Sequence, residues 1–364
     1  MKVLVAPDKF KGSLTAAEVA SAVASGLADG HPSVAVATLP VADGGDGTVD
    51  AAVAAGFRRL RVPARGPTGE LVTASYAVRG ETAVVELAEA SGLHRLPGAP
   101  APLTATSAGT GDVIAAAVAA GCRRIVLGVG GSACTDGGAG LLTALGARLL
   151  DSSGRELPFG GAALSRLASL DVSGVSEVDV ELASDVDNPL YGPRGAAFVY
   201  GPQKGASPEE VETLDSALRH WASIAGPEFA ARPGAGAAGG VGFAAMAVLG
   251  ARMRPGISLL LDLLDFDSAL AGASLVITGE GSLDRQTLSG KAPAGVAAAA
   301  AAAGIPCVAV SGRCLLTAPE LAEAGISAAY ALTDLEPDPA RCMTEAAPLL
   351  RRLSHRIAAD HLAR

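Results

Sequence analysis

The sequence predicts an α/β protein made of two α/β domains, one of them discontinuous. Short apolar runs alternate with helical spacing near both ends of the chain, a pattern typical of parallel sheets flanked by helices. Alternating strand segments separated by turns interrupt that rhythm after residue 60. We therefore predict a Rossmann/flavodoxin-like domain from residues 1–60 plus 268–364. Residues 61–267 are predicted to form an inserted mixed α/β domain with a β-meander and a glycine-rich phosphate loop.

The composition limits the kinds of partner. The 364 residues suffice for two domains, and the net charge of −9, with no basic run to offset it, argues against nucleic acid or an anionic membrane. The alanine-rich run at 296–303 is too short to span a bilayer, and no N-terminal segment resembles a signal peptide. Five cysteines, an odd number without ligand-like spacing, predict a reduced, cytoplasmic protein.

The first strand is predicted over Lys2–Ala6, an apolar run of the length of a buried strand. Thr15 and Glu18 have the spacing of a capping box, which predicts a helix from about Thr15 to Asp29. The loop between strand and helix therefore lies at the carboxyl end of a strand, where open α/β sheets bind ligands. This loop concentrates four polar side chains, Asp8, Lys9, Lys11 and Ser13.

A second strand, Val34–Leu39, leads into the loop Pro40–Thr48, which carries two aspartates among three glycines. Helix capping could account for one of these aspartates, but two suggest a further role. The aspartates are Asp43 and Asp46. The meander that follows is predicted from the segments Leu60–Pro63, Leu71–Val78 and Thr82–Leu87.

The central motif is the glycine-rich stretch Gly128–Gly140, which follows a predicted strand over Arg123–Leu127. Apolar residues at helical spacing continue from Ala139 to Leu150. Strand, glycine loop and helix together offer backbone N–H groups to an anion, so the stretch resembles a phosphate cradle with a metal-facing acid. The alternative is a glycine-rich turn that binds no ligand. The candidate groups are Gly130, Gly131, Ser132, Thr135, Asp136, Gly137 and Gly138.

Lysine is rare in this chain, with five lysines against 23 arginines. Four of the five lie in polar Gly/Pro-rich stretches, and a compact ammonium is a common phosphate ligand. A solvated loop charge is the alternative for each. These lysines are Lys9, Lys11, Lys204 and Lys291.

The segment after the predicted strand Asp179–Ala183 is the best candidate for general-base chemistry. Asp185 and Asp187 stand two residues apart, with Asn188 beside them, and paired carboxylates can divide the work between holding Mg²⁺ and orienting or deprotonating a hydroxyl. One of them could instead cap the Asn-Pro turn, and the sequence leaves open which aspartate acts.

A second glycine loop, Gly234–Gly242, opens a predicted helix over Phe243–Leu249. It could approach a nucleotide through its backbone or serve as a close packing site, and both alternatives stay open. The βαβ rhythm then resumes with strands predicted over Ser274–Thr278, Ile305–Val310 and Ala328–Leu332. Glu280 lies in the loop after the first of these.

Several enzyme classes are disfavoured. The chain has no Gly-x-x-x-x-Gly-Lys-Ser/Thr motif, so it is not a P-loop NTPase. Gly128-x-Gly-x-x-Ala133 fits a dinucleotide fingerprint only loosely. All five histidines fall outside the glycine loops, so acid–base chemistry rests on carboxylates or lysines.

Eight motifs occur in this order: Pro7-Asp-x-Phe-Lys-Gly-Ser-Leu14, Pro40-Val-Ala-Asp-Gly-Gly-Asp-Gly-Thr48, Gly128-Val-Gly-Gly-Ser-Ala133, Thr135-Asp-Gly-Gly-Ala-Gly140, Asp185-Val-x-Asn-Pro-Leu190, Gly201-Pro-Gln-Lys-Gly-Ala206, Gly234-Ala-Gly-Ala-Ala-Gly-Gly240 and Thr278-Gly-Glu-Gly281. Together they resemble the bacterial glycerate kinase family of the glyoxylate and glucarate pathways, from Met1 to about residue 312. Lys9 stands where the family often has Ser, and Asp46 where Glu is also common. The segment after Gly312 lacks the expected acidic residues.

The resemblance implies ATP-dependent phosphorylation of D-glycerate with Mg²⁺, in a cleft between two α/β domains. The product it favours is 2-phosphoglycerate, with 3-phosphoglycerate as the alternative. D-Glycerate and ATP are the expected partners, and a homodimer is compatible with the sequence. An NAD(P)-dependent dehydrogenase of a small hydroxy acid, using the loop at 128–133, and a non-catalytic sensor are the other hypotheses.

On this hypothesis each candidate residue has an expected role. The catalytic residues are Asp187, Asp185 and Lys11. ATP is expected to bind Gly130, Gly131, Ser132, Thr135, Gly137, Gly138, Lys204 and Lys291. Glycerate is expected to bind Asp8, Lys11, Ser13, Asp43, Asn188 and Glu280, and Mg²⁺ some of Asp43, Asp46, Asp136 and Asp185.

Overall fold

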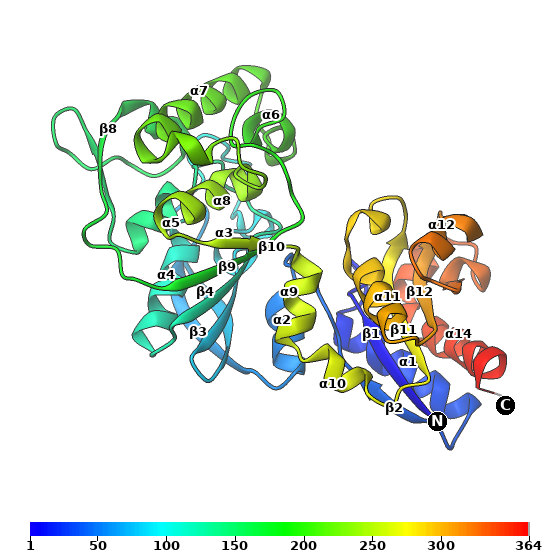
Figure 1. Cartoon of the computed structure of the whole chain (residues 1–364). Helices are drawn as coiled ribbons and strands as arrows, with labels where there is room; N and C mark the ends of the chain where they lie inside the picture. The colour runs from blue at the N-terminus through cyan, green and yellow to red at the C-terminus, as the bar shows by residue number, and fades with distance from the viewer. Residues whose placement is uncertain (363–364) are drawn as a thin grey trace. The chain divides into compact units, whose positions relative to one another are not determined.

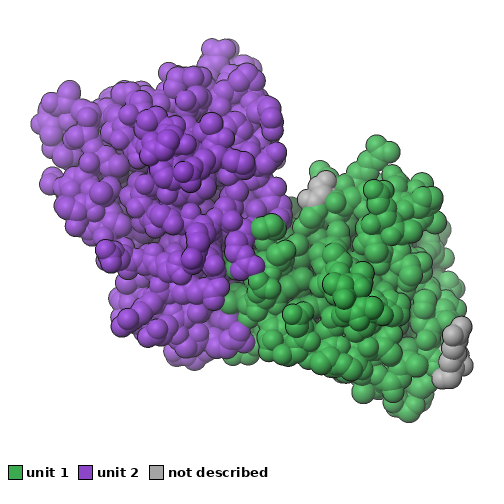
Figure 2. All heavy atoms as spheres, viewed as in Figure 1, with its two compact units in different colours: residues 1–43, 50–56, 255–364 green, residues 44–49, 57–254 purple. Residues whose placement is uncertain are grey.

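The computed structural model of the protein describes residues 1–362 (Figure 1). Contacts within the chain divide it into two compact units, coloured separately in Figure 2. Unit 1 comprises Met1–Asp43, Asp50–Gly56 and Pro255–Arg364, and unit 2 comprises Gly44–Val49 and Phe57–Arg254. Among the described residues, no helix is long and apolar enough to cross a membrane.

Unit 1 is built on a sheet of five parallel strands in the order β13-β12-β11-β1-β2. The strands are β1 (Lys2–Pro7), β2 (Ala35–Thr38), β11 (Leu275–Leu283), β12 (Cys307–Cys314) and β13 (Ala328–Ala331). Numbered within the unit, this is the flavodoxin-like order 2-1-3-4-5, whose direction reverses between β1 and β11.

The helices of unit 1 cover that sheet. They are α1 (Ala16–Gly30), α9 (Gly256–Leu263), α10 (Phe266–Leu270), α11 (Ala292–Ala302), α12 (Ala318–Glu323), α13 (Pro339–Thr344) and α14 (Ala346–His361), with short turns η5 (Thr287–Ser289) and η6 (Leu332–Asp334). The predicted capping box at Thr15 and Glu18 is confirmed at the start of α1. Gly26 lets α1 and α14 approach closely, since a Cβ there would lie 2.1 Å from the Arg351 carbonyl oxygen. Both helices share one apolar core with β1, β11 and β12.

Unit 2 contains a mixed six-stranded sheet in the order β10-β9-β6-β5-β4-β3. The strands are β3 (Arg58–Arg65), β4 (Leu71–Arg79), β5 (Thr82–Glu86), β6 (Arg124–Gly128), β9 (Asp179–Ala183) and β10 (Arg252–Arg254). The first three pair antiparallel, which confirms the predicted meander, and the others pair parallel. A separate hairpin pairs β7 (Arg148–Asp151) with β8 (Leu167–Asp171).

The helices of unit 2 pack around a single apolar core that contains Trp221 and Phe243. The α-helices are α3 (Ala88–Ser91), α4 (Ala108–Ala119), α5 (Ala139–Ala144), α6 (Ala196–Tyr200), α7 (Pro208–Ala225) and α8 (Ala237–Val248). The 3₁₀ turns are η1 (Leu93–Arg95), η2 (Gly161–Arg166), η3 (Pro202–Lys204) and η4 (Pro227–Phe229). Helix α2 (Thr48–Ala54) begins in unit 2 and continues in unit 1.

The predicted α/β fold class is confirmed, with one difference of detail. The helical spacing from Ala139 to Leu150 does not form one helix: α5 ends at Ala144, Gly146 adopts a φ of 105°, and β7 begins at Arg148. The predicted limits of the domains, 1–60 with 268–364 and 61–267, stay a prediction. By its contacts, the short loop Gly44–Val49 groups with unit 2 although its flanks group with unit 1.

Candidate active site

The polar residues of unit 1 gather where the strand order reverses. Asp8 follows β1, Glu280 lies in the last part of neighbouring β11, and Asp43 follows β2. The Asp8 N–H donates to the Gly279 carbonyl oxygen at 2.8 Å, which joins the two strand ends. Reversal points at the carboxyl ends of strands are the usual ligand sites of open α/β sheets. This polar cluster is therefore a candidate binding site.

The carboxylates of this cluster repel one another. Burial and, to a lesser extent, the charges of Asp43 and Glu280 together raise the pKa of Asp8 to about 7, against the opposing effect of Lys9. Crowded carboxylates favour a proton or a cation among them. The arrangement is thus suited to bind a hydroxyl group or a positively charged group.

Glu280 is held by two side chains from the segment before α11. The Thr287 hydroxyl donates to its Oε1 at 2.5 Å, and Lys291 Nζ lies 3.7 Å from its Oε2. Burial raises the pKa of Glu280, and these two partners oppose the shift. Lys291 is the N-cap residue of α11 and a third of its side chain is exposed, so its ammonium can still reach a ligand.

The loop between β1 and α1 presents Lys11 to solvent. Phe10 anchors the loop in the core, and the Ser13 hydroxyl donates to the Met343 carbonyl oxygen of α13 at 2.6 Å. The loop passes over β11, since a Cβ on Gly281 would lie 3.3 Å from the backbone nitrogen of Lys11. Contacts with β11 and α13 therefore fix the loop.

In unit 2 the first half of the glycine stretch packs against the loop Gly44–Val49. A Cβ on Gly128 would lie 2.7 Å from the Gly44 carbonyl oxygen, and one on Gly131 would lie 2.3 Å from Asp46 Oδ1. Gly131 is exposed and Gly130 is half-buried, whereas Ser132–Gly140 are buried. Only Gly130 and Gly131 thus offer their backbone to a ligand.

The second half of the stretch makes room for protein rather than for a ligand. A Cβ on Gly137 would lie 2.6 Å from the Trp221 ring, and one on Gly138 would lie 2.5 Å from Ala244. The Trp221 indole N–H also donates to the Gly137 carbonyl oxygen at 3.0 Å. The predicted contact of Gly137 and Gly138 with ATP therefore does not fit their surroundings.

Asp136 is fully buried within this half. Its Oδ2 accepts from the Ser107 N–H at 2.8 Å, from the Ser107 hydroxyl at 2.9 Å, from the Gly140 N–H at 3.2 Å and from the Thr106 hydroxyl at 3.3 Å. Its Oδ1 accepts from the Gly138 N–H at 3.1 Å. A carboxylate occupied by five protein donors does not fit the predicted magnesium ligand. Its position indicates a structural role.

Lys204 lies beneath the glycine stretch and only 3% of it is exposed. Its Nζ donates to the Ser132 hydroxyl at 2.8 Å and to the Cys134 carbonyl oxygen at 2.5 Å. Burial lowers its pKa, and the charge of Asp136 opposes that shift. Thr135 nearby is fully buried, and among the described residues its hydroxyl has no hydrogen-bond partner. Lys204 thus supports the loop from within.

The second glycine loop has the packing role that the sequence left open. Residues 238–240 have positive φ and kink the start of α8. A Cβ on Gly239 would lie 2.1 Å from the Cys134 carbonyl oxygen, and the Gly239 carbonyl oxygen accepts from the Gly137 N–H at 2.9 Å. The two glycine loops therefore pack against each other.

The segment after β9 lies beside the glycine stretch, because Ala183 pairs with Gly128. Asp185 and Asp187 are both exposed, and Asp187 forms an ion pair with Arg194 at 3.6 Å. Asn188 accepts from the Tyr200 hydroxyl at 2.7 Å and donates to the Arg194 carbonyl oxygen at 2.8 Å. Asn188 thus holds the turn, and the side chains of the two aspartates are exposed.

Sequence reasoning missed Glu86, the last residue of β5. It is 5% exposed, and its Oε2 accepts from the N–H groups of Gly47 at 3.0 Å and Val49 at 3.2 Å, which fixes the loop that carries Asp46. Burial raises its pKa to about 7. The sequence did contain a signal for Glu86, because a carboxylate follows an apolar strand there as it does at Asp8.

The fold and the site define an α/β protein whose strand ends carry carboxylates, lysines and an exposed glycine backbone, a set suited to phosphoryl transfer. The model of the "Glycerate kinase family" matches residues 3–362. The chain is 44% identical to the glycerate kinase of Bacillus subtilis (strain 168), over 99% of this chain and 97% of that protein. It is 43% identical to the glycerate 2-kinase of Escherichia coli (strain K12), over 86% of this chain and 85% of that protein.

A crystal structure of a glycerate kinase 2 candidate from Salmonella typhimurium LT2 has a TM-score of 0.87 and 41% identity, and the match covers 100% of this chain and 98% of that one. The chain belongs to the glycerate kinase family. It is therefore an enzyme of the kinase class, which sets aside the dehydrogenase and sensor hypotheses.

Proposed function

We propose that this protein transfers the γ-phosphoryl group of ATP to a hydroxyl group of D-glycerate and releases ADP. The observation that carries the proposal is the likeness, over nearly the whole chain, to proteins named glycerate kinase. The Escherichia coli relative is named glycerate 2-kinase, which favours 2-phosphoglycerate over 3-phosphoglycerate as the product. We place the reaction in the cytoplasm, in line with five cysteines that are all free.

We assign glycerate to the polar cluster of unit 1. Glycerate carries one carboxylate and two hydroxyl groups, so its site needs a cation and hydrogen-bond acceptors. Asp8, Asp43 and Glu280 supply acceptors near the ends of β1, β2 and β11. Lys11 is exposed and supplies an ammonium group for the carboxylate, and the Ser13 hydroxyl can still accept a hydrogen bond.

We assign the ATP phosphates to the exposed backbone at Gly130 and Gly131. A ligand can reach this backbone because Gly131 is exposed and Gly130 is half-buried, and glycine N–H groups are common phosphate donors. Ser132 and Lys204 support this backbone through their hydrogen bond, and Thr135 is buried nearby. Lys291, which is partly exposed, is the lysine we assign to direct charge neutralisation.

Three of the four aspartates predicted as magnesium ligands are compatible with binding Mg²⁺. Within residues 1–362, no group of three or more His, Cys, Asp or Glu side chains could hold a metal ion. Mg²⁺ in phosphoryl-transfer sites commonly uses one or two carboxylates together with phosphate oxygens and water, and Asp43, Asp46 and Asp185 are compatible with that role. Bound there, Mg²⁺ would offset the charge of the phosphates. Asp185 or Asp187 remains our proposal for the residue that orients the acceptor hydroxyl.

A coupled ADP-release assay with ATP, Mg²⁺ and D-glycerate tests this function. We expect ADP release that depends on D-glycerate, and a much weaker rate for Lys11→Met at low glycerate concentration. ADP release that is equal with and without glycerate would contradict the proposed acceptor. L-Glycerate serves as the matched control for stereochemistry.

A further inference from the structure

Helix α13 lies in the C-terminal segment for which the sequence motifs predict no role. It has six residues, begins with Pro339 after the N-cap Asp338, and contacts the loop between β1 and α1. The contact is made by the Met343 carbonyl oxygen, which accepts from the Ser13 hydroxyl at 2.6 Å. Carbonyl groups in the last turn of a helix have no partner within the helix, so this oxygen is available to another segment. Helix α13 thus holds the loop by its C-terminal end.

A second contact joins the same two segments. Gly12 adopts a φ of 79°, and a Cβ there would lie 3.3 Å from the Met343 methyl carbon. Phe10 and Cys342 belong to the same apolar core of unit 1. The loop that carries Lys11 is therefore in contact with α13 through its backbone turn as well as through Ser13.

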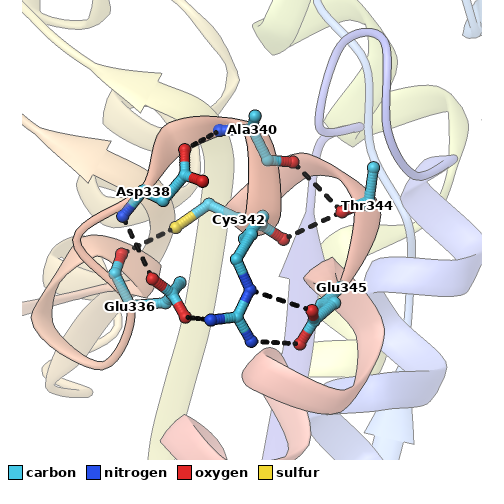
Figure 3. A network of polar contacts seen from close by, with 7 residues as sticks. Glu336, Asp338, Ala340, Cys342, Thr344 and Glu345 are labelled. Carbon is cyan, nitrogen blue, oxygen red and sulfur yellow. Dashed lines mark hydrogen bonds and ion pairs between the residues drawn. The ribbon is translucent and has the colours of Figure 1, made fainter.

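Six residues are too few to make a helix stable by itself, so α13 depends on contacts around it. Arg341 contributes contacts on both sides of the helix, to Glu336 and Glu345, and Figure 3 shows where these two carboxylates lie. Its Nη1 lies 2.7 Å from Glu336 Oε2, before the helix, and its Nε and Nη2 donate to Glu345 after the helix at 3.2 Å and 3.4 Å. One planar guanidinium thus joins the two ends of α13.

Further hydrogen bonds complete this network. Glu336 also accepts from the Asp338 N–H at 3.1 Å, and its carbonyl oxygen accepts from the Cys342 thiol at 3.0 Å. Asp338 in turn accepts from the Ala340 N–H at 2.9 Å. A single exposed ion pair contributes little to stability, but Arg341 connects a network in which backbone groups take part.

We propose that α13 is a positioning element for the glycerate site and that Arg341 is its positioning residue. Arg341 touches no substrate; it keeps α13 in place so that Met343 holds Ser13, and Ser13 fixes the loop that presents Lys11. The inference rests on the proposed function, in which Lys11 and Ser13 bind glycerate. It predicts that Arg341 affects glycerate and leaves the nucleotide unaffected.

The test compares Arg341→Ala and Arg341→Lys with Arg352→Ala, an exposed arginine of α14. Since a small displacement of a binding group costs about 10- to 100-fold in rate, we expect Arg341→Ala to lower kcat/KM for D-glycerate by about tenfold. KM for ATP should stay within about twofold of the native value, and lysine, which keeps one charge, should restore part of the loss. Equal effects on both substrates, or no effect beyond that of Arg352→Ala, would overturn the proposal.

Hydrogen–deuterium exchange without substrate separates this inference from the proposed function. In Arg341→Ala, the peptide covering residues 8–14 should exchange about tenfold faster, because its contact with α13 is loosened. If the native enzyme failed to phosphorylate glycerate, this result would still support the coupling between α13 and the loop. If Arg341→Ala did not fold, Ser13→Ala would remove the one hydrogen bond, and unchanged exchange at 8–14 would overturn the coupling.

Discussion

Replacing Asp136 by asparagine should destabilise the protein without acting through a metal. The native carboxylate is fully buried and accepts five hydrogen bonds, from Thr106, Ser107, Gly138 and Gly140. Asparagine keeps one acceptor oxygen and places an NH₂ group where the other oxygen stood, so at least one buried donor loses its acceptor. An unsatisfied buried donor costs about 1–3 kcal/mol, and the remaining bonds lose their charge assistance. We expect the free energy of unfolding to fall by about 2–5 kcal/mol.

Urea unfolding followed by tryptophan fluorescence measures this loss. Trp221 is the only tryptophan of the chain and donates to Gly137, next to Asp136, so its emission reports on this region. Glu212→Gln, which changes an exposed carboxylate of α7 in the same way, is the matched control and should shift the midpoint little.

The Mg²⁺ dependence of activity distinguishes a structural role of Asp136 from a role as a metal ligand. In the fraction of Asp136→Asn that remains folded, the Mg²⁺ concentration for half-maximal activity should match the native value. A variant as stable as the native protein that needs much more Mg²⁺ would refute the structural role of Asp136 and restore it as a metal ligand.

Three further results are expected. Lys204→Met should lower the free energy of unfolding in urea by about 1–3 kcal/mol, because the Ser132 hydroxyl and the Cys134 carbonyl oxygen lose their donor. It should also raise KM for ATP more than KM for glycerate. An unchanged KM for ATP would show that Lys204 does not affect nucleotide binding. Because the pKa of Glu86 is raised from 4.5 to about 7 in the folded state, the folded protein retains a proton that the unfolded chain loses, so stability should fall by about 3 kcal/mol as pH rises through this range. Glu86→Gln should flatten this dependence in urea unfolding at several pH values, and an unchanged slope would contradict the assignment. Asp185→Asn or Asp187→Asn should lower turnover by about 10²–10⁴-fold with little effect on unfolding, and full turnover in both would exclude these residues as the base.

The strands and the first helix could be predicted from the sequence because they depend on local patterns. The apolar run Lys2–Ala6 forms most of β1, and Thr15 with Glu18 caps α1 as expected. Alternation with turns likewise located the strands of the meander. Such features are visible within a short window of residues.

The packing of the glycine loops could not be predicted, because a glycine needed for a ligand and one needed for a neighbouring chain segment look alike in sequence. Gly137 makes room for Trp221, which lies far along the chain, and Gly239 for the Cys134 carbonyl oxygen. The sequence around Asp136 does not reveal its hydrogen-bond donors, because Ser107 and Thr106 come from a distant segment. We therefore expected Asp136 to face a metal. Long-range contacts of this kind decide which polar residues remain available for chemistry.

The most direct test of the central claim is phosphorus NMR of the product formed from ATP, Mg²⁺ and D-glycerate. We predict stoichiometric conversion of the ATP consumed into ADP and a single phosphoglycerate, with the phosphate on the 2-hydroxyl group. A phosphate on the 3-hydroxyl would contradict the proposed regiochemistry. ADP accompanied only by inorganic phosphate would contradict phosphoryl transfer to glycerate altogether.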